Sequence, residues 1–173
     1  SQEINTVVDI CLKDKDYTTY NFMQWYVAEQ IEEEALARHI LDKLKLRSME
    51  ITEFANVLHI LRSEKPDYIY NLAAQSFVAD SFDHPHLTSD INYNGVLNIL
   101  EAIKIEGIDC NIYQASTSEM YGDVLSDPQD ENTPFNPLSP YAVAKAAAHA
   151  LTRNYRFAYD IKASNGILFN HES

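Results

Sequence analysis

The segments ASTSEMYG at residues 115–122 and SPYAVAK at residues 139–145 decide how the chain folds. The first has the pattern of a strand end that is followed by hydroxyl and carboxylate side chains. The second has the pattern of a helix start, because Ser139 is a favourable N-cap residue and Pro140 a favourable first helical residue. We therefore predict that polar side chains from a strand and a helix meet here.

Tyr141 and Lys145 are suited to proton transfer. They are four residues apart, so on a helix they lie on the same face and can contact one ligand. A nearby ammonium favours the phenolate, so we expect a lowered pKa for Tyr141 and a role as a base. The alternative is an ordinary surface tyrosine and lysine, because this spacing alone is common.

The composition excludes several classes of partner. The 173 residues carry a net charge of −13, which disfavours nucleic acid and anionic membranes. No apolar run approaches the ~20 residues of a membrane span, and no signal peptide opens the sequence, so we expect a cytoplasmic protein. Cys11 and Cys110 are too few and too far apart for a disulfide framework or a zinc site, and we expect both to be buried thiols.

Residues 47–173 alternate between strand and helix patterns, which predicts an α/β fold with a parallel sheet. Thr52 is the expected cap of the first helix. The expected strands are 49–52, 68–74, 111–116 and 162–169, and the expected helices are 53–63, 87–106 and 140–159. Ligand sites in such sheets lie at the carboxyl ends of the strands. Polar residues follow three of these ends, at 74–76, 116–119 and 170–172.

Glycine is scarce, with only four in the chain, and none precedes Gly95. Ordinary usage of ~7% would give about a dozen. A dinucleotide-binding fold normally begins with a glycine-rich turn under the pyrophosphate. This sequence therefore predicts a partial Rossmann-like sheet in which that turn is missing.

Residues 1–46 have a helical and strongly acidic pattern. Asp16 can cap a second helix that runs from about Thr18 to Leu46. Gln30 and Glu33 fall on its apolar stripe, which also contains Phe22, Tyr26, Ala37, Ile40 and Leu44.

A carboxylate that faces a core is costly unless it is paired or binds a metal. Glu29, Glu32 and Glu33 could ligate iron or another hard cation if partner helices supplied further ligands. The alternative is a solvated acidic face.

The segment NFMQWYVAEQIEEE at residues 21–34 resembles the last long helix of bacterial non-haem ferritins. The resemblance covers about residues 2–46. It implies that Glu33 is a di-iron ligand, that Gln30 lies beside the iron centre, and that Glu29 and Glu32 belong to an accessory iron site. Three further helices of that fold are absent from the sequence, so this segment could bind iron only with partner helices.

The remaining residues, from about 48 to 173, resemble the GDP-mannose 4,6-dehydratase family of the extended short-chain dehydrogenases/reductases. The motifs are YNLAAQSFV at 70–78, YQASTSEMYG at 113–122, DE at 130–131 with PF at 134–135, YAVAK at 141–145 and GILFNHES at 166–173.

The resemblance implies the catalytic roles of four residues: Thr117, Glu119, Tyr141 and Lys145. Tyr141, helped by Lys145, would take the proton of the C4 hydroxyl of GDP-mannose as hydride leaves for NADP. Glu119 would remove the C5 proton and assist loss of the C6 hydroxyl as water, while Thr117 would polarise the C4 carbonyl.

The same resemblance implies the residues that contact ligands. Contacts to NADP are expected from Glu50, Ile51, Leu72, Ala73, Ala74, Gln75, Ser76, Lys145 and His171. Contacts to GDP-mannose are expected from Ser76, Thr117, Asn170 and Glu172. The sequence departs from the family at Glu50, where Asp is usual, and at Leu87, where Tyr is usual.

We therefore expect two parts: a ferritin-like helical segment at 1–46 and a partial NAD(P)-binding domain at 47–173. In the family, the first strands and the glycine-rich loop precede the position of Glu50. Without them, we expect weak NADP binding and an open edge beside strand 68–74. The main hypothesis is an impaired nucleotide-sugar dehydratase that forms a homo-oligomer or pairs with a complementing chain. The alternatives are an iron-binding or helix-assembly module and a non-functional chimera.

Overall fold

The computed structural model describes residues 6, 9, 10, 13–16, 18, 19, 21–23, 26, 31–36, 38, 47–124 and 128–170. The contacts within the chain divide it into two units, Ser1–Arg47 and Ser48–Ser173. Each unit is described by itself. Within the part of the chain that the structure describes, no helix is both long enough and apolar enough to cross a membrane.

The first unit is helical, as predicted: every described residue from 18 to 38 is in a helix. The Asp16 cap is also confirmed, since the Thr19 N–H donates to Asp16 Oδ1 at 3.1 Å. Glu32 and Glu33 are exposed, as are Phe22 and Tyr26 of the apolar stripe, which agrees with the alternative of a solvated acidic face. Glu29, Gln30 and Cys11 lie outside the described residues.

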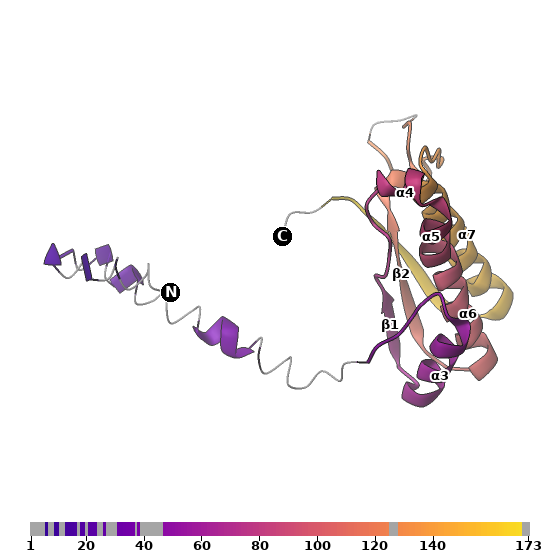
Figure 1. The fold of residues 1–173 in the computed structure, drawn as a ribbon, viewed down its shortest axis with the longest axis horizontal. Helices are drawn as coiled ribbons and strands as arrows, with labels where there is room; N and C mark the ends of the chain where they lie inside the picture. The colour runs from indigo at the N-terminus through magenta and orange to yellow at the C-terminus, as the bar shows by residue number, and fades with distance from the viewer. Residues whose placement is uncertain are drawn as a thin grey trace. The chain divides into compact units, whose positions relative to one another are not determined.

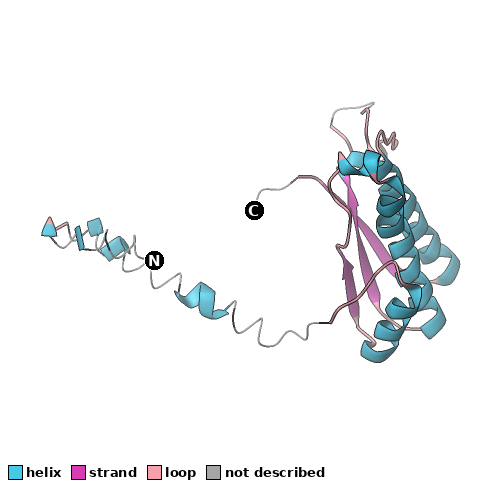
Figure 2. Cartoon of the chain, viewed as in Figure 1, coloured by secondary structure: helices cyan, strands magenta, loops and turns pink. Residues whose placement is uncertain are grey.

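The second unit is built on a three-stranded parallel sheet of β1 (Tyr68–Asn71), β2 (Asn111–Thr117) and β3 (Lys162–Leu168). The strands lie in the order β1-β2-β3, and Figure 2 shows the sheet in magenta beside the helices. Successive strands are joined through helices, as parallel pairing requires. The predicted α/β class and parallel sheet are confirmed.

Three longer helices cover one face of this sheet: α3 (Phe54–Glu64), α6 (Gly95–Glu106) and α7 (Pro140–Tyr159) (Figure 1). Two short helices, α4 (Asp80–Asp83) and α5 (Pro85–Ser89), and a π-helical turn, Asp90–Asn94, precede α6. Apolar side chains of the helices and strands form one core. Its members are Ile51, Val57, Leu61, Val96, Ile99, Leu100, Ala102, Ile103, Cys110, Ile112, Ala148, Tyr155, Ile161 and Ala163.

Helix α7 begins and ends where the sequence predicts. The Ala142 N–H donates to Ser139 Oγ at 3.0 Å, and Pro140 occupies the first turn. At the other end, Asp160 adopts a left-handed conformation with φ of 55° that stops the helix. The buried thiol predicted for Cys110 is confirmed as well, at 2% exposure.

The strand predicted at 49–52 is wrong, because these residues form a turn. The Glu53 N–H donates to the Glu50 carbonyl, and the Glu50 N–H donates to Asn56 Oδ1 at 2.8 Å. Thr52 does not cap α3; its hydroxyl instead donates to Glu50 Oε1 at 2.8 Å. The carbonyls of Ile51 and Thr52 accept hydrogen bonds from Asn98 Nδ2 of α6, at 2.9 Å and 3.1 Å, so these two polar groups are satisfied without a neighbouring strand.

Tyrosines lie on the sheet face opposite the three helices. Tyr70 and Tyr113 are in contact, with ring centroids 6.2 Å apart, and Tyr70 is 68% exposed. A Cβ at Gly166 would lie 1.8 Å from Tyr113 Oη, so glycine alone lets this ring cross β3. Within the described residues β1 pairs only with β2, which agrees with the expected open edge.

Replacement of Leu100, which is fully buried in the core, tests this packing. We expect Leu100→Ala to lower the free energy of unfolding by about 2–5 kcal/mol, because it removes buried apolar contacts and leaves a cavity. Urea denaturation followed by circular dichroism measures the loss. Ile105→Ala on the same helix is the control, since Ile105 is 54% exposed; equal losses for the two variants would contradict the assigned core.

Candidate active site

The candidate site lies where β2 ends and α7 begins. Thr117 is the last residue of β2 and is 8% exposed. Its Oγ1 accepts the Glu119 N–H at 3.2 Å, which fixes the 3₁₀ turn Ser118–Met120 directly after the strand. Glu119 itself is exposed. The turn therefore presents a hydroxyl and a carboxylate at the carboxyl edge of the sheet.

Tyr141 and Lys145 reach this edge from the first turns of α7. Tyr141 is 8% exposed and Lys145 is 4% exposed. Lys145 Nζ donates to the Ala115 carbonyl at 3.0 Å and lies 6.0 Å from the centre of the Tyr141 ring. The expected shared helical face is confirmed.

The pKa values differ from the sequence-based expectation. Burial raises the pKa of Tyr141, the Thr117 hydroxyl acts in the opposite direction, and the Glu119 carboxylate raises it further. The prediction that Lys145 lowers the pKa of Tyr141 is therefore wrong for this structure. Burial also lowers the pKa of Lys145, to about 8, so desolvation dominates at both groups.

The loop after β1 is held by a buried asparagine. Asn92 lies in the π-helical turn and is 1% exposed. Its Oδ1 accepts the Gln75 N–H at 2.9 Å, and its Nδ2 donates to the Gln75 carbonyl at 3.0 Å. Both backbone groups of Gln75 are thus fixed by one side chain.

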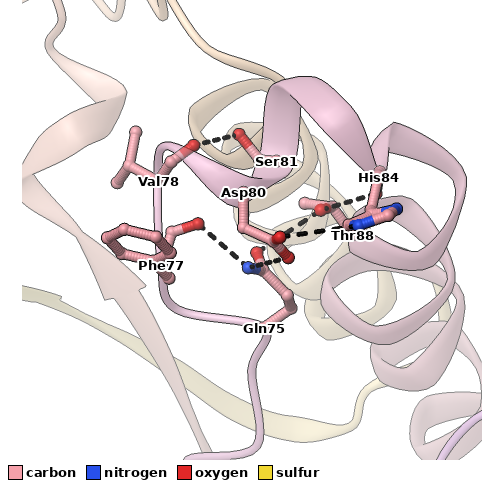
Figure 3. A network of polar contacts seen from close by, with 7 residues as sticks. All are labelled: Gln75, Phe77, Val78, Asp80, Ser81, His84 and Thr88. Carbon is pink, nitrogen blue, oxygen red and sulfur yellow. Dashed lines mark hydrogen bonds and ion pairs between the residues drawn. The ribbon is translucent and has the colours of Figure 1, made fainter.

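The Gln75 side chain also has internal partners, which Figure 3 shows. Its Nε2 donates to the Phe77 carbonyl at 2.9 Å and to Asp80 Oδ2 at 3.2 Å. The Thr88 hydroxyl lies 3.3 Å from Gln75 Oε1. Asp80 in turn pairs with His84 at 3.6 Å. This network makes Gln75 a residue that shapes the loop.

The loop residues beside Gln75 are accessible. The strand ends at Asn71, so the buried strand predicted to continue to Ala74 is wrong. Leu72 is 65% exposed, and Ala73 and Ser76 are also exposed, while Ala74 is partly buried. These four residues remain predicted ligand contacts.

The other predicted contacts are dispersed or lie outside the described residues. Ile51 is packed in the core, and the Glu50 carboxylate accepts hydrogen bonds from Thr52. Asn170 is exposed just beyond the end of β3. His171 and Glu172 lie outside the described residues.

Two residues near the site were missed by sequence reasoning. Asn92 is buried in the polar π-helical turn DINYN, and the sequence carries no signal that singles it out. His149 lies on α7 four residues beyond Lys145, and its Nδ1 is 3.0 Å from Ser116 Oγ. Extending the four-residue spacing from Tyr141 and Lys145 would have identified it.

A cavity of about 890 Å³ lies apart from the four predicted catalytic residues. It is bounded by α7, by β3 and by residues 129–135. His149, Arg153 and Asn165 are among its lining residues, and none of Thr117, Glu119, Tyr141 and Lys145 is. Among the described residues, no group of three or more His, Cys, Asp or Glu side chains could hold a metal ion.

A family model described as GDP-mannose 4,6 dehydratase matches residues 7–173. The chain belongs to this family. A GDP-mannose 4,6-dehydratase of Yersinia enterocolitica is 52% identical over 126 residues, which cover 72% of this chain and 34% of that protein. The structure of RMD from Pseudomonas aeruginosa complexed with NADPH is similar, with a TM-score of 0.67 and 30% identity over 72% of this chain and 43% of that one.

The family assignment extends into the N-terminal residues. A GDP-mannose 4,6-dehydratase of Sordaria araneosa is 41% identical over 174 residues, which cover 99% of this chain and 31% of that protein. The family model likewise begins at residue 7. These matches give no support to the ferritin-like interpretation of residues 2–46 or to iron binding. The chain spans about a third of the length of the curated relatives it matches.

The buried ammonium predicts how stability depends on pH. The pKa of Lys145 is about 8 in the folded chain and 10.5 ordinarily, so between these values the unfolded chain binds more protons. We therefore expect the free energy of unfolding to rise with pH across this window, by up to about 3 kcal/mol at ~1.4 kcal/mol per pKa unit. Urea denaturation at several pH values measures it. Lys145→Met should lack this rise, and identical pH profiles would contradict the assignment.

Proposed function

We propose that this chain carries the acid–base part of a GDP-mannose 4,6-dehydratase site and converts GDP-mannose to GDP-4-keto-6-deoxy-mannose. The observation that supports this most is the grouping of a hydroxyl, a phenol and a carboxylate at the end of β2. Thr117 and Glu119 both influence the pKa of Tyr141, so the three side chains lie close enough to contact one substrate. The family membership and the relatives' names support the choice of substrate.

The reaction needs a proton acceptor at the C4 hydroxyl of the mannosyl unit. Tyr141 fits this position, but its raised pKa keeps it a phenol at neutral pH. It must lose its proton before it can accept another. Movement of the Lys145 ammonium from the Ala115 carbonyl toward the phenol would favour the phenolate, because an adjacent positive charge stabilises it.

Elimination of water needs a second base. Oxidation at C4 gives a ketone that acidifies the C5 proton, and the exposed Glu119 carboxylate can remove it. The C6 hydroxyl then leaves with a proton as water. Thr117, at the strand end, can donate a hydrogen bond to the C4 oxygen and favour the ketone. C5 then regains a proton, the one that Tyr141 took from the C4 hydroxyl, so the net change is the loss of one water from each GDP-mannose.

A nicotinamide cofactor would, when bound, accept a hydride from C4 and return it to C6. Lys145 and the exposed residues Leu72 and Ser76 lie at the carboxyl edge of the sheet and suit its nicotinamide and ribose end. Gln75 suits it less, because its polar groups have internal partners. The NADPH complex of the similar Pseudomonas aeruginosa structure supports this class of cofactor.

Tyr141→Phe and Glu119→Gln test the proposal. We expect each to lower the rate of product formation about 10²–10⁴-fold, because each removes one proton-transfer group. The assay incubates the chain with GDP-mannose and excess NADP and measures the loss of one water by mass spectrometry.

Tyr68→Phe is the matched control and should keep the wild-type rate, since Tyr68 is a 64% exposed tyrosine on β1. Absence of product from the wild-type chain, or equal rates in all variants, would overturn the proposed function.

A further inference from the structure

Three side chains on one face of α7 contact three successive residues of β2. Tyr141 meets the Thr117 hydroxyl, and Lys145 Nζ donates to the Ala115 carbonyl at 3.0 Å. His149 continues the spacing of four, with Nδ1 3.0 Å from Ser116 Oγ. Residues spaced in this way lie along one helical stripe. His149 is the one member of the stripe that has no role in the proposed reaction.

His149 also joins α7 to its other neighbours. The Phe135 ring packs edge-on against the imidazole, with centroids 5.2 Å apart. Asn165 Nδ2, on β3, donates to the His149 carbonyl at 3.1 Å. The imidazole position is therefore defined by β2 and by the loop before α7, while Asn165 on β3 holds the backbone of His149.

The surroundings of His149 favour an uncharged ring. Burial lowers its pKa, and the nearby Arg153 guanidinium lowers it further. No acidic group contributes to that shift, and Lys145, one turn earlier, is also basic. An uncharged imidazole can share one hydrogen bond with the Ser116 hydroxyl through Nδ1 without a charge to compensate.

We propose that His149 is a positioning residue for the candidate active site: its bond to Ser116 fixes α7 against the end of β2 and so holds Lys145 and Tyr141 in place. This inference rests on the proposed function only for the statement that Tyr141 and Lys145 are the reacting groups. The contact itself is a property of the free chain.

The geometry explains why this contact can control Lys145. Ser116 lies between Ala115, whose carbonyl holds the Lys145 ammonium, and Thr117, which faces Tyr141. Lys145 is buried only while α7 stays close to this strand end. If α7 turned or moved away, water would reach the ammonium, and its pKa would return toward the ordinary value.

The alternative is that His149 simply fills space beside Phe135. Two variants distinguish the possibilities. His149→Phe keeps an aromatic ring but has no atom that can hydrogen bond to Ser116. His149→Asn keeps a polar atom near the position of Nδ1 and loses most of the ring. A space-filling role predicts that the phenylalanine variant is the milder one, and a positioning role predicts the opposite.

The experiment follows the titration of Lys145 by NMR in the 173-residue chain with isotope-labelled lysine, assigned with Lys145→Met. We expect the Lys145 pKa of about 8 to rise by at least about one unit in His149→Phe and to stay within about half a unit in His149→Asn. His59→Phe, at an exposed histidine on α3, is the control and should change nothing.

An unchanged Lys145 pKa in His149→Phe, or an equal rise in both His149 variants, would overturn the inference. If His149→Phe fails to fold, the His149→Asn variant and Ser116→Ala keep the test open: Ser116→Ala should raise the pKa, and no rise would count against the positioning role. Since no substrate is used, failure of the dehydratase assay and failure of this experiment are separate results.

Discussion

The hydrogen bond from the buried Lys145 ammonium to the Ala115 carbonyl connects α7 to β2, and it also fixes the position of Lys145 in the candidate site. A buried ammonium is costly unless it has a partner, and its pKa of about 8 reflects this cost. The packing of α7 on the sheet offsets it and keeps Lys145 beside the end of β2. Because Tyr141 lies one turn earlier on the same helix, the bond also sets the position of the phenol.

The candidate site also requires that the loops at the carboxyl edge of the sheet have a fixed conformation. Asn92 holds both backbone groups of Gln75, and Thr117 caps the turn that carries Glu119. In both cases a side chain forms hydrogen bonds to backbone groups of the loop and so fixes its conformation. The edge therefore presents accessible groups at Leu72, Ser76 and Glu119 on a fixed backbone.

Sequence reasoning succeeded where the signal is local. Helix α7 was predicted to the residue, because Ser139 and Pro140 mark its start and the run of helix-forming residues continues to Tyr159. It failed at residues 49–52, since a strand depends on a neighbour that local sequence does not reveal. The pKa of Tyr141 was predicted in the wrong direction, because burial raises it more than the Thr117 hydroxyl lowers it, and the Lys145 ammonium does not contribute to the shift. Contacts between distant segments, such as His149 with Ser116, became visible only in the fold.

The central claim is that GDP-mannose binds where β2 meets α7. The most direct test is a backbone-amide NMR titration of the chain with GDP-mannose. The account predicts that shift changes cluster at residues 115–119 and 141–145. Changes that cluster instead around the cavity lined by Arg153 and Asn165, or none at millimolar substrate, would contradict it.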